Sequence, residues 1–379
     1  MTRSRNIPGF KRMALSLLEQ ADVVVGGSRP WDIQVHDERF YTRVLLNGSL
    51  GLGETYMEGL WDVERIDQFI HRLLLQRLNY RVQPLSARFL AASSRIANRQ
   101  SRSRAGMVAE VHYDLDNDFY QAMLDDHMAY SCGYWERAET LQEAQDHKLA
   151  LICRKLGLEP GMRLLDIGCG WGSLVRHAAD HYGVEAVGVT ISRRQAELAT
   201  TRCKGLPVDI RLQDYRDIDE KFDRIASVGM FEHVGYRNYR HYMKIARRCL
   251  DDDGLFLLHT IGQMNTDFNV DPWIERYIFP NSELPSMKQI AEAVEGIFVI
   301  EDIHSFGADY DPTLMAWHDN FQRAWPAFAD RFDERFHRMW EYYLLCCAAS
   351  SRARQMQVWQ FVLSPNGIPG GYRRPALSG

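Results

Sequence analysis

The sequence predicts an α/β fold, in which a doubly wound sheet of seven strands follows a small, mainly helical N-terminal domain. From about residue 110, apolar runs of strand length alternate with helical patterns. A glycine-rich turn joins the first of these runs to the next helical pattern, as is common in such sheets. At 379 residues, the chain is also long enough for two domains.

The first 109 residues divide into two segments by composition. Residues 1–76 contain short helical patterns and the turn-rich segment Ser-Leu-Gly-Leu-Gly-Glu at 49–54. Residues 77–109 contain no acidic residue, and their basic residues are Arg77, Arg81, Arg88, Arg95, Arg99, Arg102 and Arg104. This segment is either a solvated linker helix or a surface for anionic lipid headgroups, to which each basic residue adds about 1 kcal/mol. We therefore expect an N-terminal domain at 1–76, a basic linker at 77–109 and the main domain at 110–379.

Seven segments of the main domain have the length and apolar content of buried strands. They are residues 162–167, 185–191, 207–212, 223–228, 254–260, 297–303 and 357–363. Helical patterns lie between most of them, which is typical of a mainly parallel sheet. Ligands of such sheets bind beyond the carboxyl ends of the strands, so the residues that follow each strand are the candidate site residues.

The bulk composition narrows the class of protein. A hydrophobic content of 46% and a charged content of 25% are ordinary for a globular chain. The net charge of −5 provides no general attraction to nucleic acid or anionic lipid, so any such contact is local. The sequence shows no apolar run that spans a bilayer and no signal-peptide core. The seven cysteines are scattered without a C-x-x-C pair, which predicts reduced thiols in a cytoplasmic protein and no metal site.

The glycine-rich turn is the most informative motif. The apolar run 162–167 stops at Gly168-Cys169-Gly170-Trp171-Gly172, and a helical pattern follows. Glycine lets the backbone turn sharply and lets a ligand approach it, and the helix start offers N–H groups to a carboxylate or phosphate. The G-x-G-x-G spacing differs from the G-x-G-x-x-G spacing of dinucleotide sites. It resembles the first motif of class I S-adenosylmethionine-dependent methyltransferases.

Polar residues follow the next two predicted strands. Many such methyltransferases place an acidic residue after the second strand to hold the ribose, whereas this chain has Thr190 and Gln195. These neutral side chains either take the ribose or cap a helix. After the third strand, Gln213 or Asp214 is expected to accept a hydrogen bond from the adenine amine, and Tyr215 to pack on its ring.

Four further segments make the resemblance more specific. They are Tyr-Ser-Cys-Gly-Tyr-Trp at 130–135, Gly-Met-Phe-Glu-His-Val-Gly at 229–235, Leu-Leu-His-Thr-Ile-Gly at 257–262 and Phe-Gly-Ala-Asp-Tyr-Asp at 306–311. Together with segment 49–54, they closely resemble the bacterial cyclopropane-fatty-acyl-phospholipid synthases and, more distantly, the mycolic acid cyclopropane synthases. The similarity covers nearly the whole chain.

The resemblance implies a Rossmann-like methyltransferase sheet and a defined reaction. S-adenosylmethionine donates a methylene group, net, across the cis double bond of an acyl chain in a membrane phospholipid. The implied protein is a homodimer that associates peripherally with the inner face of the cytoplasmic membrane. A nucleic-acid methyltransferase is disfavoured, because the chain lacks an N/D-P-P-Y segment and its basic segment has few aromatic residues for base stacking.

The resemblance also assigns roles to residues of this sequence. The methionine part of S-adenosylmethionine is assigned to Tyr130, Ser131, Gly168 and Gly170, the ribose to Thr190 and Gln195, and the adenine to Asp214 and Tyr215. The further expected cofactor contacts are Asp166, Cys169 and Gln213. The family binds bicarbonate, which the resemblance places among Cys132, Glu232, His259, the backbone of Ile261 and Tyr310.

The chemistry explains this second set. An alkene is a poor nucleophile, so the sulfonium methyl must be held close to it in a closed, dry site. Methyl transfer leaves a carbocation, and loss of a proton from the new methyl to bound bicarbonate closes the ring. Glu232 and His259 are expected to orient that weak base, and Tyr310 to stabilise the cation through its ring face. Taken singly, Cys132 also fits a small buried hydrophobe, His259 a core histidine and Glu232 an ion-pair partner.

An aromatic stripe lies between the last two predicted strands. It recurs at helical spacing through Trp317, Phe321, Trp325, Phe328, Phe332, Phe336, Trp340 and Tyr343, and Cys347 continues it. Helix core is the default interpretation of such a stripe, and an acyl-chain pocket is the alternative. Cys347 matches a cysteine treated as the family's active-site residue, although the chemistry needs no thiol nucleophile.

Two alternatives remain from the sequence. An enzyme that makes methyl-branched acyl chains is one, and the intact set of Cys132, Glu232, His259 and Tyr310 favours cyclisation over it. A lipid-binding protein that keeps the fold without the chemistry is the other. The intact glycine turn and Glu232 favour an active enzyme.

Overall fold

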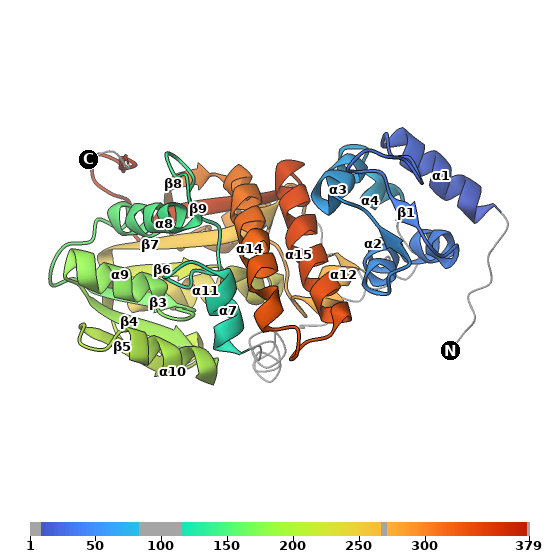
Figure 1. Cartoon of the computed structure of the whole chain (residues 1–379). Helices are drawn as coiled ribbons and strands as arrows, with labels where there is room; N and C mark the ends of the chain where they lie inside the picture. Colours follow the sequence, from blue (N-terminus) through green and yellow to red (C-terminus); the bar gives the residue numbers. More distant parts are fainter. Residues whose placement is uncertain (1–8, 83–115, 267–270, 377–379) are drawn as a thin grey trace. The chain divides into compact units, whose positions relative to one another are not determined.

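The chain forms two compact units. The computed structural model describes residues 9–82, 116–266 and 271–376 (Figure 1). The first unit comprises the described residues within 1–97, 268–280 and 314–356, and the second comprises those within 98–267, 281–313 and 357–379. These units differ from the sequential division that we expected at residues 76 and 109, because two later segments group with the N-terminal helices. Most of the basic linker at 77–109 lies outside the described residues.

The second unit contains a seven-stranded sheet with the order β5-β4-β3-β6-β7-β9-β8 (Figure 1). Its strands are β3 (Arg163–Ile167), β4 (Glu185–Thr190), β5 (Val208–Leu212), β6 (Phe222–Val228), β7 (Leu250–Gln263), β8 (Val299–Ser305) and β9 (Met356–Ser364). Strands β3 to β7 are parallel, and β8 is antiparallel to β9. Each strand overlaps one of the seven predicted segments, so the predicted α/β fold is confirmed.

Helices cover both faces of this sheet. They are α7 (Asn117–Met123), α8 (Leu141–Lys155), α9 (Ser173–Tyr182), α10 (Arg193–Arg202), α11 (Tyr236–Cys249) and α13 (Met287–Val294), with 3₁₀ turns η1 (Tyr215–Asp217), η2 (Phe231–His233) and η3 (Gly307–Asp309). Neighbouring strand residues point to opposite faces: Leu164 packs with the apolar residues of α8 and α9, whereas Leu165 packs with those of α11 and α13. Burial on both faces explains the apolar sequences of the central strands β3 and β7, whereas the edge strand β5 carries charged and partly exposed residues.

The first unit is mainly helical. It contains α1 (Phe10–Gln20), α2 (Arg39–Met57), α3 (Ile66–Leu75), α4 (Leu78–Arg81), α12 (Pro272–Tyr277), α15 (Glu334–Arg352), the turn η4 (Trp325–Ala327) and a two-stranded pair of β1 (Gln34–Val35) and β2 (Trp61–Asp62). Helix α14 (Tyr310–Ala324) begins in the second unit and ends in the first. Among the described residues, no helix is both long and apolar enough to cross a membrane.

The glycine-rich segment at 49–54 has a packing role within the first unit. A Cβ atom on Gly53 would lie 2.4 Å from the indole ring of Trp273, so only glycine allows α2 to approach α12 this closely. The Trp273 side chain is buried, and its ring lies 4.7 Å from that of Tyr342 in α15. The segment therefore joins helices that are distant in the sequence.

The aromatic stripe forms helix core in part, because Trp325, Phe332 and Phe336 are only half-buried. Trp317 and Phe321 in α14 and Trp340 and Tyr343 in α15 are all buried. The rings of Trp340 and Tyr343 lie 5.4 Å apart in an edge arrangement that favours aromatic pairs.

Candidate active site

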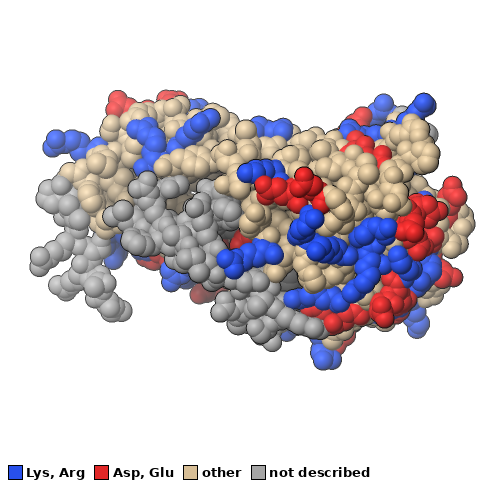
Figure 2. Space-filling model, turned by 180° about the vertical axis from the view of Figure 1, so that it is seen from behind, with Lys and Arg blue, Asp and Glu red and all other residues tan. Residues whose placement is uncertain are grey.

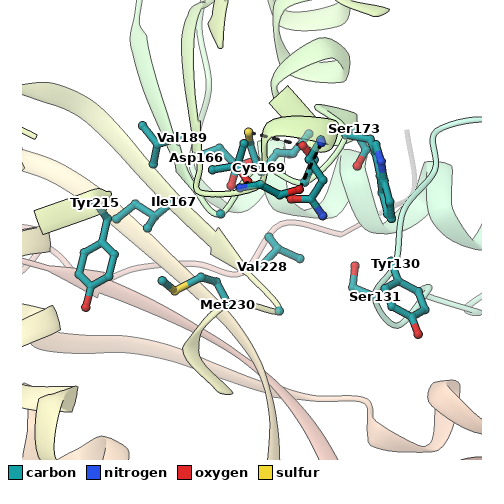
Figure 3. Close-up of a pocket in the computed structure, with 18 of the residues that line it drawn as sticks. Tyr130, Ser131, Asp166, Ile167, Cys169, Ser173, Val189, Tyr215, Val228 and Met230 are labelled. Carbon is teal, nitrogen blue, oxygen red and sulfur yellow. Dashed lines mark hydrogen bonds between the residues drawn. The ribbon is translucent and has the colours of Figure 1, made fainter. Parts of the chain in front are cut away.

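A pocket lies in the second unit, where β3, β4 and β6 end (Figure 3). Its lining includes all eleven residues that we expected to contact the cofactor: Tyr130, Ser131, Asp166, Gly168, Cys169, Gly170, Thr190, Gln195, Gln213, Asp214 and Tyr215. Figure 3 shows Tyr215 on one side of the pocket and Tyr130 with Ser131 on the other. The parallel strands bring these residues together, because their carboxyl ends meet at one edge of the sheet.

The glycine turn has the backbone conformation that its sequence predicts. Gly168, Gly170 and Gly172 have φ angles of 84°, 55° and 82°, a region that side chains other than glycine rarely adopt. The N–H groups of Gly168 and Cys169 both donate to the Val189 carbonyl at 3.0 Å, which attaches the turn to the end of β4. Among the described residues other than its two chain neighbours, none has an atom within 4 Å of a Cβ built on Gly170, so the space beside it is open to a ligand.

The polar residues after β4 and β5 have specific partners. The Thr190 hydroxyl donates to Gln195 Oε1 at 2.9 Å, and both residues are buried. Ser192, rather than either of them, caps α10. Asp214 caps η1 and accepts from Arg216 Nε at 2.8 Å, so this carboxylate is already engaged by a cation. Tyr215 is buried, with its ring 5.1 Å from that of Tyr242.

A buried cation also lines the pocket, and sequence reasoning missed it. Lys148 on α8 is 1% exposed and donates to the Ser131 hydroxyl at 2.8 Å. Burial lowers the pKa of Lys148 to about 8. The signal was present, because Gln145, Lys148 and Lys155 recur at helical spacing with apolar residues such as Ile152 on one face of α8.

Asp166 lies at the floor of the same pocket. Its Oδ1 atom accepts no hydrogen bond from the residues that the structure describes. Burial raises the pKa of this carboxyl to about 7, an effect that the charge of Lys148 partly offsets. A buried acceptor without a donor is costly, so this atom is suited to a donor that a ligand brings, such as an ammonium group.

A second cluster, outside the pocket lining, comprises Glu232 after the end of β6 and His259 and Ile261 in the last part of β7. Glu232 in η2 accepts a hydrogen bond through Oε1 from the backbone N–H of Ile261 at 2.5 Å. The Gly229 N–H donates to the His259 carbonyl at 3.0 Å, which ties the end of β6 to β7. Glu232 Oε2 is buried and accepts no hydrogen bond from any described residue. Burial raises the pKa of Glu232 to about 7 and lowers that of His259 well below its usual value.

The remaining predicted residues lie in two places. Cys132 and Tyr310 are buried in the second unit, where the Gly133 N–H donates to Thr313 Oγ1 at 3.1 Å and so joins the two segments. Burial raises the pKa of the Cys132 thiol well above its usual value. Cys347 belongs to the first unit, and burial raises its pKa to about 12. Both thiols are therefore protonated near neutral pH and are poor nucleophiles.

Comparisons with known proteins identify the family of the chain. The family model for mycolic acid cyclopropane synthetase matches residues 100–361. The chain is 53% identical over 363 residues to the cyclopropane-fatty-acyl-phospholipid synthase of Escherichia coli strain K12, which covers 96% of this chain and 95% of that protein. The solved structure of the cyclopropane synthase MmaA2 from Mycobacterium tuberculosis is 33% identical, with a TM-score of 0.64 over 68% of this chain and 97% of that one. That of the mycolic acid cyclopropane synthase CmaA1 with SAH and CTAB is 35% identical, with a TM-score of 0.63 over the same shares. The chain therefore belongs to the mycolic acid cyclopropane synthetase family and is an S-adenosylmethionine-dependent methyltransferase.

Proposed function

We propose that the chain transfers a methylene group from S-adenosylmethionine to the cis double bond of unsaturated acyl chains in membrane phospholipids. The observation that carries the proposal is the buried Glu232 carboxylate, which accepts from the Ile261 N–H, with the buried His259 two residues earlier on β7. These three residues are not among those that line the pocket, but Glu232 lies between the lining residues Met230 and His233. Transfer of a methyl group to an alkene leaves a carbocation that must lose a proton, and a buried carboxylate is suited to organise that step. The name of the 53% identical relative supports the same reaction.

S-adenosylmethionine supplies an electrophilic methyl group on its sulfonium. We assign its adenine to the side of the pocket formed by Gln213, Asp214 and Tyr215, and its ribose to Thr190 and Gln195. Because Arg216 already engages Asp214, Gln213 is the freer hydrogen-bond partner for the adenine amine. We assign the methionine part to Tyr130, Ser131 and the glycine turn, with Asp166 and Lys148 placed for its ammonium and carboxylate.

We also propose bicarbonate as a ligand of the second cluster. When bound, it supplies a weak base beside the reacting carbons. The orphaned Oε2 of Glu232 fits this ligand, because it lacks the donor that a bicarbonate hydroxyl brings. Glu232 accepts that hydroxyl, and His259 donates to the anion. The Ile261 N–H is shared with Glu232, so it is the least available of the expected contacts.

Two further properties of the chain's residues favour the reaction. The ring face of Tyr310 stabilises positive charge that develops on the acyl chain. The burial of Cys132, Glu232, His259 and Tyr310 excludes water, which would otherwise capture a carbocation.

The product distinguishes this function from its alternatives. The purified protein, incubated with S-adenosylmethionine and vesicles of an unsaturated phospholipid, is expected to yield acyl chains that are one CH₂ unit heavier. NMR of the product is expected to show ring methylene protons. A methyl signal on an alkene would instead indicate a branching enzyme, and an unchanged acyl chain would indicate a lipid-binding protein.

We further propose that the protein is a cytoplasmic homodimer that binds the inner face of the membrane, with the N-terminal unit as its lipid- or dimer-associated part. On the face shown in Figure 2, Lys and Arg side chains lie among Asp and Glu side chains, so this face presents mixed charge to a membrane. The basic segment at 77–109 has no acidic residue, which makes it the better candidate for anionic headgroups.

Replacing Arg88, Arg95, Arg99 and Arg102 with Gln is expected to weaken binding to anionic vesicles, and added salt is expected to weaken wild-type binding. Co-sedimentation with vesicles measures both effects. A control that removes the exposed charges of Arg193, Lys204, Lys244 and Arg373 has the same net charge and should bind as the wild type does. Equal binding by both variants at low salt would make the segment only a linker.

A further inference from the structure

A buried lysine lies behind the second cluster. Lys155 at the end of α8 is fully buried, and its ammonium donates to Gln360 Oε1 at 2.8 Å and to His304 Nδ1 at 3.0 Å. Asp302 is the nearest acidic group, at 3.9 Å, and it is already paired with Arg374 at 2.6 Å. Burial of an ammonium is costly, and an apolar side chain at this position would avoid that cost.

Gln360 connects this lysine to His259. Its Nε2 atom lies 3.2 Å from His259 Nδ1, and both side chains are buried. Burial lowers the pKa of Lys155 to about 7, although the charge of Asp302 opposes this shift. In its protonated form Lys155 is an ammonium with donors only, so the atom of Gln360 that it contacts at 2.8 Å is then the amide oxygen. The amide NH₂ therefore faces His259, and because it too can only donate, His259 Nδ1 must accept. A neutral imidazole that accepts at Nδ1 carries its proton on Nε2.

We propose that Lys155 and Gln360 are positioning residues that hold His259 in the tautomer protonated at Nε2. This inference rests on the proposed role of His259 as a donor to the small anion. Without Lys155, the Gln360 amide is free to turn over and present its oxygen to His259, which would move the imidazole proton to Nδ1. The buried ammonium thus selects which ring nitrogen of His259 is the donor.

The electrostatic surroundings keep the His259 imidazole neutral. The position of its single ring proton, and not its charge, therefore decides which ring nitrogen can donate a hydrogen bond. Burial and the charges of Lys148 and Lys155 hold the pKa of His259 well below its usual value. Titratable groups around Lys155 include His304, Asp302, Arg374 and Tyr372, and burial lowers the pKa of His304 to about 4. An imidazolium at position 259 is therefore disfavoured near neutral pH.

Gln360→Glu tests the inference directly. One carboxylate oxygen keeps the bond from Lys155, and the other accepts from His259, so the proton of His259 is expected to move to Nδ1. In protein labelled with ¹⁵N-histidine, with the His259 signals identified by their loss in His259→Asn, the shifts of the two ring nitrogens should exchange. Turnover should fall at least about tenfold with unchanged affinity for S-adenosylmethionine. Lys155→Met should populate both tautomers, and Lys155→Arg, which also has donors only, should restore the wild-type signals.

Tyr372→Phe is the matched control. The Tyr372 hydroxyl donates to the backbone carbonyl of Lys155 at 3.0 Å, so this variant removes a neighbouring hydrogen bond without changing the ammonium. In the Tyr372→Phe variant, the His259 tautomer and the turnover should be the same as in the wild type. A wild-type spectrum with the proton on Nδ1, or ring-nitrogen shifts that Gln360→Glu leaves unchanged, would overturn the inference. Exchanged shifts with normal turnover would overturn the role of the tautomer in the reaction. A wild-type protein that forms no ring product would instead count against the proposed function.

Discussion

Glu232→Gln is expected to lower turnover by about 10²-fold or more, the scale of a positioned acid–base group. Glutamine keeps the shape of the side chain and still accepts from the Ile261 N–H through its oxygen. It lacks the negative charge, and it replaces the free Oε2 acceptor with a donor. Affinity for S-adenosylmethionine should barely change, because the loss falls on the transition state. Added bicarbonate should not restore activity, whereas wild-type activity should drop when carbonate is stripped from the buffer.

The same substitution is expected to stabilise the fold at high pH. The pKa of Glu232 rises from 4.5 to about 7 on folding, so the folded protein binds this proton more tightly than the unfolded chain does. The wild-type protein therefore loses stability as the pH rises from 4.5 to about 7, by up to about 3 kcal/mol. Glutamine at this position does not titrate, so the variant does not lose stability in this way as the pH rises. Urea unfolding measures the free energy of unfolding of both proteins at about pH 5 and about pH 8, which lie near the two ends of that interval. The variant should exceed the wild type in stability by more at the higher pH.

Glu220→Gln is the matched control, because hydrogen bonds from Arg211 and Arg163 lower the pKa of this carboxyl. Its stability contribution is present above the unfolded pKa and is lost at lower pH, so the control should be less stable than the wild type at pH 8. Its turnover should be normal. Near-normal turnover of Glu232→Gln would contradict the role of Glu232 and would make His259 the first alternative site of proton handling.

Gly170→Val is expected to abolish binding of S-adenosylmethionine. The valine side chain would fill space that no protein atom occupies within 4 Å, and its β-branched carbon resists a φ angle of 55°. The variant is compared by calorimetry with Gly157→Val, which has the same backbone cost at φ 57° and equally open space, but lies outside the pocket lining. The control should lose stability and keep its affinity. If a folded Gly170→Val protein binds S-adenosylmethionine with unchanged affinity, the glycine turn is not part of the binding site.

Local sequence patterns are sufficient to predict the strands of the sheet and the edge at which the carboxyl ends of its parallel strands meet. The apolar runs end within one residue of the ends of β3, β4 and β5, and the resemblance to methyltransferases then predicts that the residues after them line a common pocket. The partners within that pocket could not be predicted. Whether Asp214 is free or paired with Arg216 depends on side-chain rotamers, which spacing does not encode.

The burial of the two lysines was missed although their helical spacing signals it, whereas the composition of the two units was beyond the sequence. Lys148 and Lys155 resemble solvated helix residues until the fold places strands and loops over them. The division at residues 76 and 109 assumed that neighbours in the chain pack together, whereas α12 and α15 pack with helices more than 200 positions earlier. Such long-range packing depends on complementary shapes, such as Gly53 against Trp273, rather than on periodicity.

The interleaving of the two units has a consequence for synthesis on the ribosome. Helices α2 and α3 emerge early, but α15, which packs against both, is complete only at Arg352. The apolar faces of the early helices therefore lack their partner until then, a state in which nascent chains are prone to aggregate or to need chaperones. The sheet has the same dependence, because β9 is inserted between β7 and β8 and follows both of them in the chain. A chain truncated before Glu334 would thus leave both units incomplete, rather than one folded domain and one missing piece.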